Sequence, residues 1–355
     1  MTQDNPVRLR DVARVAGVSQ GTASNVFNRP DIVRQEVRER VEAAAKELGY
    51  AGPSVAGRLL RAGKVNAIGV ATYESLTYFF DDPWARAVLS EISAVCDTRG
   101  AGIALVSAQN QQKVAWNIDS ALVDGFIVLC MERGEQLLQL TRNRQLPYVA
   151  LALDIDAADD SVTAIAVDNR GGALLAARHV AGLGHRRVAI LALEFSKGHV
   201  GLTSPEAAAA SIYSTDRERM YGYWQGLEEA GIGREAVPIY ETRNTKANVD
   251  ACMAELFAGD APPTAIIGMS DQVALFAMQW LRQHNIAVPQ QVSVIGFDGV
   301  PEAALSLPGL TTIEQPLAEL AQRAVAAILD DDASGGRQTL ALNLVVRGST
   351  GPAPR

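Results

Sequence analysis

Hydrophobic positions near the N-terminus recur at helical spacing and fall into three short runs. The apolar positions of the first and third runs are Leu9, Val12, Ala13, Ala16 and then Val33, Val37, Val41, Ala44, Leu48. Gly17 interrupts the pattern, and Ser19 can cap a second helix by accepting a backbone N–H group. Two helices joined by a glycine-containing turn, with a third packed behind them, are typical of a helix-turn-helix unit.

The pattern changes near residue 65, where short β-rich runs begin to alternate with helical stretches. Such alternation predicts parallel sheets covered by helices on both faces. About ten strands favour two sheets and therefore two α/β lobes, whose facing strand ends form a cleft that can close on a small molecule. The runs are VNAIGVAT, GIALVSA, GFIVLC, YVALAL, AIAVD, RVAILAL, VPIYE, AIIGMS, VSVIGFD and LNLVVR.

Charge is distributed unevenly along the chain, whose formal net charge is −8. Residues 1–64 contain 11 Lys and Arg against 7 Asp and Glu, whereas the other residues contain 21 against 33. A basic N-terminal segment followed by an acidic remainder indicates a polyanionic partner for that segment alone.

Composition argues against several other classes of protein. No run approaches 18 consecutive apolar residues, and MTQDNPVRLRDV lacks the apolar segment of a signal peptide, so we expect a cytoplasmic protein without membrane contact. If the polyanion bound by the basic N-terminal segment is DNA, the protein is nucleoid-associated. We find no nucleophile elbow, phosphate-binding glycine loop or metal-ligand spacing, so we expect no enzyme, no metal and no cofactor. We interpret Cys96, Cys130 and Cys252 as buried free thiols. We interpret His179 and His185 as residues with a structural role.

The second predicted helix carries small and polar residues where a core helix would carry bulky ones. A recognition helix enters a DNA major groove about 12 Å wide, where Gln20 and Asn25 are candidate adenine readers. Thr22 and Ser24 can reach phosphates or bases. The positions expected to face the other two helices are Ala23, Val26 and Phe27.

The segments VRLRDVARVAGVSQGTASNVFN and VRERVEAAAKELGY resemble the DNA-binding domain of the lactose/galactose repressor family of bacterial transcription regulators. VDGFIVL, VAVDNRGGALLAARHVAGLGHRRVAIL, RMYGYWQGLEEAGI, VSVIGFDGVP and LTTIEQPLAELAQRAVAAIL follow in the family's order, so the resemblance covers residues 7–350. It implies a homodimeric repressor that reads a pseudo-palindromic operator. A small effector would shift the dimer between DNA-competent and incompetent forms.

The resemblance also implies the domain organisation, an all-α helix-turn-helix domain followed by a two-lobed, periplasmic-binding-protein-like α/β domain. The three expected domains are residues 1–50 for DNA binding, 51–64 for the hinge and 65–350 for effector binding and dimerisation. Within the last domain, the expected lobes are residues 65–165 with 314–331, and residues 166–313 with 332–350.

The implied DNA contacts include a hinge as well as the recognition helix. By the resemblance, Gln20, Gly21 and Asn25 fall on base-reading positions, and Gly21 has no side chain to offer. Leu59 falls on a leucine that relatives insert into the minor groove, where unstacking costs a few kcal/mol that added contacts offset. The alternative is that Leu59 is an interdomain core residue. The complete set of expected DNA contacts is Ser19, Gln20, Gly21, Thr22, Ser24, Asn25, Arg58 and Leu59.

The resemblance places two charged side chains in the cleft. Arg219 falls on the arginine that holds the effector's hydroxyls or carboxylate, a role that suits a guanidinium fork. Asp298 falls on an aspartate that accepts hydrogen bonds from the ligand. Of Ser270 and Asp271, one is expected to touch the ligand and the other to cap the next helix. The alternative for Arg219 is a surface arginine at the start of a helix, and the alternative for Asp298 is an N-cap or turn aspartate.

Aromatic and acidic residues are expected at the rim of the cleft. Trp84 occupies the family's aromatic position, where an indole stacks on a sugar or a flat base, and Asp82 and Tyr73 lie near it. Ordinary packing is the alternative for all three. The effector is predicted to be a sugar or sugar derivative, with a purine or small acid as alternatives, and its action as inducer or corepressor is left open.

Two further features bear on partners. Residues 194–216 form a longer connection than relatives have, which predicts a lid or a source of ligand contacts, with Ser196, Lys197, His199 and Tyr213 as polar candidates. The C-terminal GSTGPAPR lacks an apolar heptad, which favours a dimer over a tetramer. A solute-binding transport protein is the rival interpretation, and the basic N-terminal segment argues against it.

Overall fold

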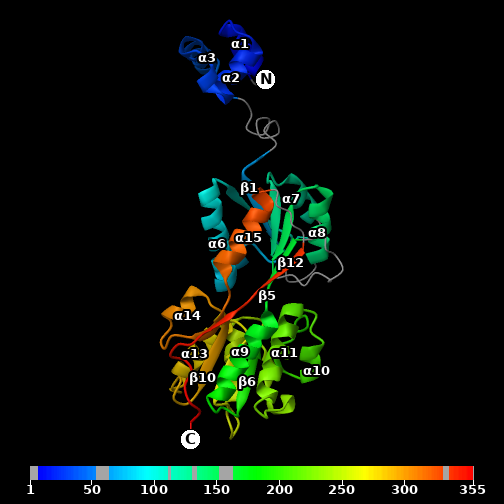
Figure 1. Cartoon of the computed structure of the whole chain (residues 1–355), viewed down its shortest axis with the longest axis vertical. Helices are drawn as coiled ribbons and strands as arrows, with labels where there is room; N and C mark the ends of the chain where they lie inside the picture. The colour runs from blue at the N-terminus through cyan, green and yellow to red at the C-terminus, as the bar shows by residue number, and fades with distance from the viewer. Residues whose placement is uncertain are drawn as a thin grey trace, which may run out of the picture. The chain divides into compact units, whose positions relative to one another are not determined.

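The computed structural model describes residues 7–52, 64–110, 113–129, 134–151, 163–330 and 336–354. The chain forms two compact units, residues 1–65, which we call the head, and residues 66–355, which we call the body (Figure 1).

The head contains three helices around a small apolar core. Their bounds are α1 Leu9–Val15, α2 Gln20–Asn28 and α3 Gln35–Glu47, with a 3-10 turn at Pro30–Ile32. Gly17 takes a left-handed φ of 64° between α1 and α2, and the Ser19 side chain caps α2 by accepting the Thr22 N–H at 3.0 Å. Both predicted turn features are therefore confirmed. The core consists of Val12, Ala13, Ala16, Ala23, Val26, Val41, Ala44 and Ala45.

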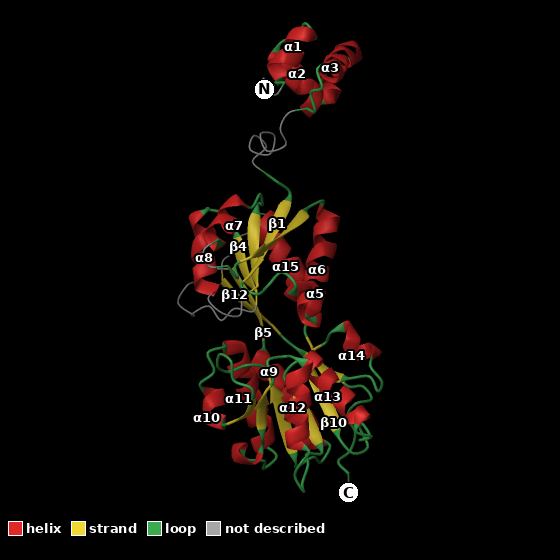
Figure 2. Ribbon diagram, turned by 180° about the vertical axis from the view of Figure 1, so that it is seen from behind, coloured by secondary structure: helices red, strands yellow, loops and turns green. Residues whose placement is uncertain are grey.

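The first lobe of the body contains a six-stranded parallel sheet in the order β12-β5-β4-β3-β1-β2. Its strands are β1 Ala67–Thr72, β2 Gly102–Ser107, β3 Gly125–Leu129, β4 Tyr148–Leu151, β5 Thr163–Val167 and β12 Gly336–Leu340. Helices lie on both faces (Figures 1 and 2), with α6 (Pro83–Arg99) and α15 (Leu317–Leu329) on one face and α7 (Val114–Ser120) and α8 (Gly134–Asn143) on the other. Ile68 and Val70 pack toward the first pair, and Ala71 packs toward the second, as strand alternation requires.

The second lobe contains a seven-stranded sheet in the order β13-β11-β10-β9-β6-β8-β7, with antiparallel strands only at its two edges. Its strands are β6 Val188–Ala192, β7 Gly201–Thr203, β8 Ile239–Glu241, β9 Ala265–Gly268, β10 Ser293–Asp298, β11 Thr311–Glu314 and β13 Asn343–Val345. Its helices are α9 Asn169–Gly182, α10 Pro205–Ala209, α11 Ser214–Glu228, α12 Lys246–Leu256, α13 Asp271–Gln283 and α14 Pro301–Leu305. Gly222 lets α11 approach α9 closely, because a Cβ there would lie 2.2 Å from the Arg170 carbonyl oxygen.

Three connections join the lobes, from β5 to α9, from β11 to α15 and from β12 to β13. The last of these corrects the expectation that residues 332–350 belong wholly to the second lobe. β12 pairs in parallel with β5 of the first sheet, and only β13 pairs with β11 of the second. The sequence of β12, GRQTL, is too polar to signal which sheet it joins.

The long connection at residues 194–216 is folded. It supplies β7, an edge strand antiparallel to β8, and then α10 before α11 begins at Ser214. The side chain of His199 contacts the Leu202 carbonyl oxygen at 3.2 Å, and Tyr213 precedes α11 as its N-cap residue. This segment therefore extends the second sheet, and its proposed role as a lid stays a prediction.

Several buried side chains have structural partners. Cys96 and Cys252 are buried free thiols, whereas Cys130 lies outside the described residues. His185 is fully buried and contacts Thr264 and Ser293 at 2.9 and 3.1 Å.

Within the described ranges, no group of three or more His, Cys, Asp or Glu side chains is arranged to hold a metal ion. None of the helices described is long and apolar enough to cross a membrane.

Candidate functional site

The head presents α2 with one buried and one exposed side. Ala23 and Val26 are buried and Phe27 packs against the core, as predicted. Gln20 and Asn25 are exposed. The α2 backbone is therefore fixed by the other two helices, while amide side chains that can read base edges project from it.

The hydroxyl groups of α2 already make local hydrogen bonds. Thr22 Oγ1 lies 2.9 Å from Ser19 Oγ, and Asn28 Nδ2 donates to Ser24 Oγ at 3.0 Å. Each hydroxyl keeps further hydrogen-bonding capacity, so these contacts orient the side chains without exhausting them. Gly21 is exposed, and a Cβ at this position would meet only Ser19 Oγ, at 3.7 Å. Arg58 and Leu59 lie outside the described residues.

In the body, Arg219 lies in the first half of α11 and is 8% exposed. Its Nε donates to Asn169 Oδ1 at 2.9 Å, and its Nη1 donates to the Met269 carbonyl oxygen at 2.6 Å. The guanidinium also stacks on the Phe297 ring, with Arg219 Cζ 3.7 Å from the ring centroid. Residues from α9, from β10 and from the turn after β9 thus hold one buried cation in place.

Asp298 is the acidic partner of this cation. Its Oδ1 lies 3.5 Å from Arg219 Nη2 and accepts a hydrogen bond from Gln315 Nε2 at 2.8 Å. Burial raises the pKa of Asp298 well above its usual range, although Arg219 opposes the shift. Asp298 also has a φ of 127°, a value that strongly favours glycine. Strain and a buried carboxyl group with a raised pKa at the end of one strand mark this position as a functional candidate.

A second set of polar side chains crosses between the lobes. Asn244 Nδ2 donates to Asp82 Oδ2 at 2.9 Å, and Ser270 Oγ donates to Asn244 Oδ1 at 2.9 Å. Asp82 caps α6 in the first lobe by accepting the Ala85 N–H, whereas Asn244 and Ser270 belong to the second lobe. The lobes are therefore linked by side chains that are also able to bind a polar ligand.

The first turn of α6 supplies two more links. Trp84 Nε1 donates to Gln315 Oε1 at 3.1 Å, and Arg86 forms an ion pair with Glu302 of α14. Trp84 is partly buried against the body core. Tyr73 packs against the cluster on the α7 and α8 face. The structure thus brings Trp84 and Asp82 to the junction between the lobes.

Ser270 and Asp271 have distinct roles. Ser270 caps α13 by accepting the Val273 N–H at 3.1 Å. Asp271 is fully buried and accepts hydrogen bonds from the Gly299 and Val300 N–H groups at 2.8 and 2.9 Å. Asp271 thus holds the loop after Asp298 and has a structural task as well as its predicted place at the site.

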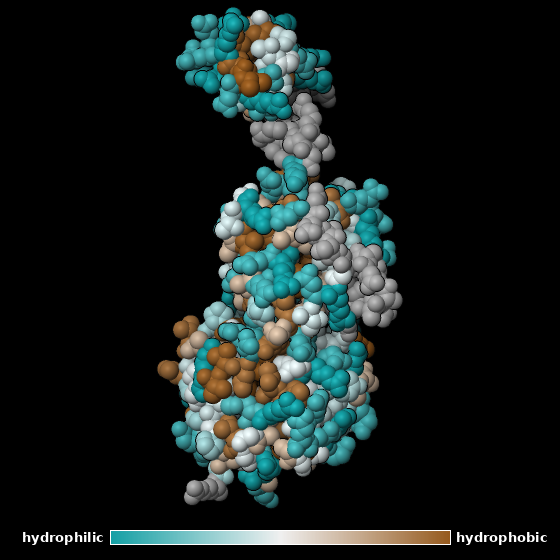
Figure 3. Space-filling model, in the orientation of Figure 1, coloured by the Kyte–Doolittle hydropathy of each residue, from teal (hydrophilic) through white to brown (hydrophobic). Residues whose placement is uncertain are grey.

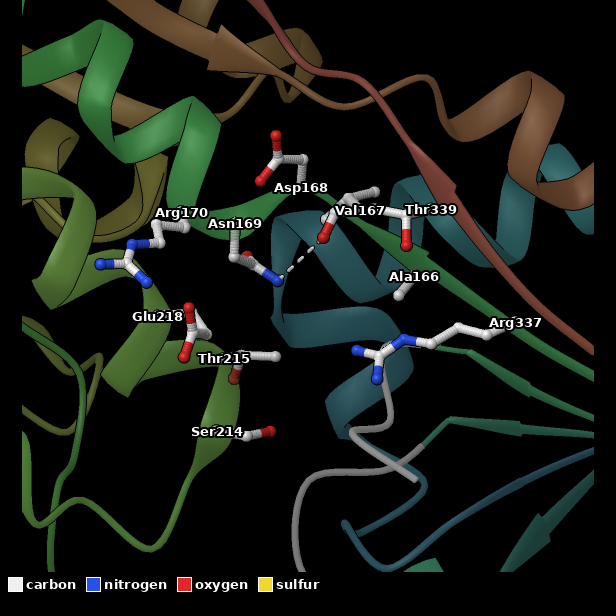
Figure 4. Close-up of a pocket in the computed structure, with 10 residues that line it drawn as sticks. All are labelled: Ala166, Val167, Asp168, Asn169, Arg170, Ser214, Thr215, Glu218, Arg337 and Thr339. Carbon is white, nitrogen blue, oxygen red and sulfur yellow. Dashed lines mark hydrogen bonds between the residues drawn. The ribbon is translucent and has the colours of Figure 1, made fainter. Parts of the chain in front are cut away.

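A pocket of about 270 Å³ lies beside this network. Figure 4 shows Arg170 and Glu218 near each other and Arg337 approaching from β12. Asn169 joins the pocket to the network, because it lines the pocket and also accepts from Arg219. The residues lining the pocket are Ala166, Val167, Asp168, Asn169, Arg170, Ser214, Thr215, Glu218, Arg337 and Thr339.

Three residues that were not predicted from the sequence contact the predicted site residues directly, namely Asn169, Asn244 and Gln315. Each follows the carboxyl end of a strand, namely β5, β8 and β11. That position is the usual place for ligand contacts in α/β sheets, and it is the signal that would have identified them.

Asp216 provides a pH-dependent prediction. It is 6% exposed in the first turn of α11, and burial raises its pKa to about 6. A raised folded-state pKa means that its contribution to stability is present below the unfolded pKa and is lost as pH rises through about 6. Asp216→Asn should therefore gain stability over the wild type, and by about 1 kcal/mol more at pH 7.5 than at pH 5. Urea unfolding at both pH values measures this, and an equal gain at both would contradict it.

Comparison with known proteins gives matches over both units. Residues 8–52 match the family model described as bacterial regulatory proteins, lacI family, and residues 177–350 match a periplasmic binding protein-like domain. The HTH-type transcriptional regulator Rv3575c of Mycobacterium tuberculosis is 35% identical over 98% of this chain and 97% of its own length.

Solved structures give matches of similar extent. The lac repressor dimer bound to operator and the anti-inducer ONPF is 26% identical, with a TM-score of 0.73 over 98% of this chain and 100% of that one. The transcriptional regulator CelR in complex with cellobiose is 26% identical, with a TM-score of 0.65 over 97% and 99% of the two chains.

Proposed function

The chain belongs to the LacI family of bacterial transcription regulators, and from this premise we propose that it is a repressor whose operator binding is controlled by a sugar. DNA binding by a helix-turn-helix domain and regulation of transcription follow from family membership. The proposal adds a homodimer on a pseudo-palindromic operator and an effector site between the lobes of the body.

The exposed face of α2 is the observation that carries the DNA-binding part. Gln20 and Asn25 project from a helix whose other side is fixed by a buried core. Amide side chains suit adenine, so we propose that these two residues read bases and that Ser19, Thr22 and Ser24 contact phosphates. We also propose that Leu59 enters the minor groove and that Arg58 contacts the DNA.

The junction between the lobes supports a sugar as effector. Planar polar side chains and aromatic rings meet there, including Arg219, Asp298, Asn244 and Trp84. Such groups bond hydroxyls in fixed directions and pack against the apolar faces of sugar rings. The bound cellobiose of the related regulator agrees with this class of ligand.

Exposed apolar side chains support assembly into a dimer. Figure 3 shows apolar surface on the second lobe. Leu305 and Leu307 are 80% and 85% exposed, and Val346 is 59% exposed. Side chains of this kind are commonly covered by a partner, and the related lac repressor is a dimer.

Selection of operators from random duplex DNA with the full chain tests the proposal. The expected product contains two inverted half-sites, because two heads related by a two-fold axis read them. Binding to the selected duplex should weaken steeply as salt rises, since phosphate contacts release counterions. Recovery of no enriched sequence, or binding that does not depend on salt, would contradict the proposal.

A further inference from the structure

Several buried carboxyl groups lie close to Arg219. Asp216, Asp271 and Asp298 are each at most 6% exposed, and Asp82 is partly buried close to them. Among the described residues, Arg219 is the only buried Lys or Arg. Several carboxyl groups therefore surround one guanidinium.

The other arginines near the site also lie close to polar groups of the protein. Arg86 is exposed and pairs with Glu302, and Arg347 donates to the Leu310 carbonyl oxygen at 2.7 Å. Arg170 and Arg337 line the adjoining pocket together with Asp168 and Glu218. Arg219 is therefore the arginine on which the charge of the site chiefly depends.

The Arg219 guanidinium is already surrounded by groups of the protein. Asp298, Asn169 and the Met269 carbonyl oxygen surround its guanidinium, and Phe297 covers one face. A ligand phosphate or carboxylate would have to displace Asp298 and would add like charge to a water-poor site, where repulsion is strong. Hydroxyl and ammonium groups are instead donors that carboxylates accept readily.

A buried hydroxyl group lies close to the same charged side chains. Tyr223 is fully buried one turn beyond Arg219 on α11, and its hydroxyl has no hydrogen-bond partner among the described residues. Burial raises the pKa of Tyr223, Arg219 opposes this shift, and Asp298 and Asp216 add to it, so the ring lies near all three side chains. A buried hydroxyl without a partner costs stability unless a water or ligand bonds it.

We propose that the site selects its effector by charge, accepting a neutral polyhydroxylated molecule or its amino derivative and excluding the same molecule when it carries a phosphate or carboxylate. This inference rests on the proposed effector site and assigns Asp298 as the residue that determines specificity. The Asp298 carboxyl group already lies against Arg219 Nη2 and so keeps anions from reaching it.

Inorganic phosphate serves as the probe, with thermal unfolding of the full chain as the readout. Phosphate is compared with chloride at equal ionic strength, for the wild type, for Asp298→Asn and for Asp330→Asn. Asp330 is exposed and pairs with Arg99, so its variant controls for loss of a paired surface carboxylate. This assay needs neither DNA nor the effector, so its failure is distinguishable from failure of the proposed function.

The wild type and Asp330→Asn should show the same small response to phosphate. Asp298→Asn frees Arg219 and should gain at least about 3 °C in Tm with phosphate. A phosphate-specific gain in the wild type that Arg219→Gln abolishes would overturn the proposal, as would no gain in Asp298→Asn. If Asp298→Asn does not fold, Asp298→Ser takes its place under the same criteria.

Discussion

Replacing Arg219 with alanine is expected to abolish the response to effector and to destabilise the body by about 3–5 kcal/mol. The reason is that Asp298 loses its ion-pair partner while it stays buried, and Asn169 and the Met269 carbonyl oxygen lose a donor. The head folds as a separate compact unit, so α2 should keep its structure in this variant. Urea unfolding gives the free-energy change, and operator binding with and without sugar gives the response.

Arg178→Ala is the matched control for this prediction. Arg178 lies on α9 and forms an exposed ion pair with Glu229 at 2.6 Å, and such surface pairs contribute less than about 1 kcal/mol. The control should therefore keep both stability and response. A normal effector response in Arg219→Ala would place the effector elsewhere.

Replacing both Gln20 and Asn25 with alanine should weaken binding to the selected operator on the order of 100-fold, because each bidentate amide–adenine pair contributes about 1–3 kcal/mol. Both side chains are exposed, so the helical content and unfolding temperature of the head should hardly change. Binding to random duplex should persist, because phosphate contacts remain. Fluorescence anisotropy measures the affinity for the selected operator and for the random duplex separately.

Ala43→Gln provides the comparison, since Ala43 is an exposed position on α3 rather than α2. This variant should bind the operator as the wild type does. Equal losses on operator and random duplex in the double variant would show that these residues contribute affinity without reading sequence.

Much of the fold was predictable because its signals are local. The three helices of the head follow from apolar spacing around Val12 and Val41, and the turn between α1 and α2 follows from Gly17 and Ser19. The buried strands of the two sheets are continuous apolar runs, which are typical of parallel sheets.

The parts of the fold that the sequence did not predict depend on contacts between distant segments. β12 joins the first sheet through pairing with β5, and nothing in its own polar sequence indicates that partner. The fold of residues 194–216 likewise depends on pairing of β7 with β8. Periodicity identifies elements, whereas their partners are set by the packing of the whole body.

The candidate effector site was predictable in part. Arg219, Asp298, Asp82 and Trp84 meet at the junction between the lobes. The structural role of Asp271 was harder to predict, because its hydrogen bonds from the Gly299 and Val300 N–H groups depend on the backbone conformation at the end of β10. A sequence shows that an aspartate follows a strand, and only the folded backbone shows which donors surround it.

Coupling between the body and the head can be measured by titrating the full chain onto its selected operator, with and without a sugar that binds the body. Saturating sugar should change operator affinity by at least about fivefold, because binding between the lobes is coupled to DNA binding. An operator affinity unchanged by a sugar that demonstrably binds the body would contradict it.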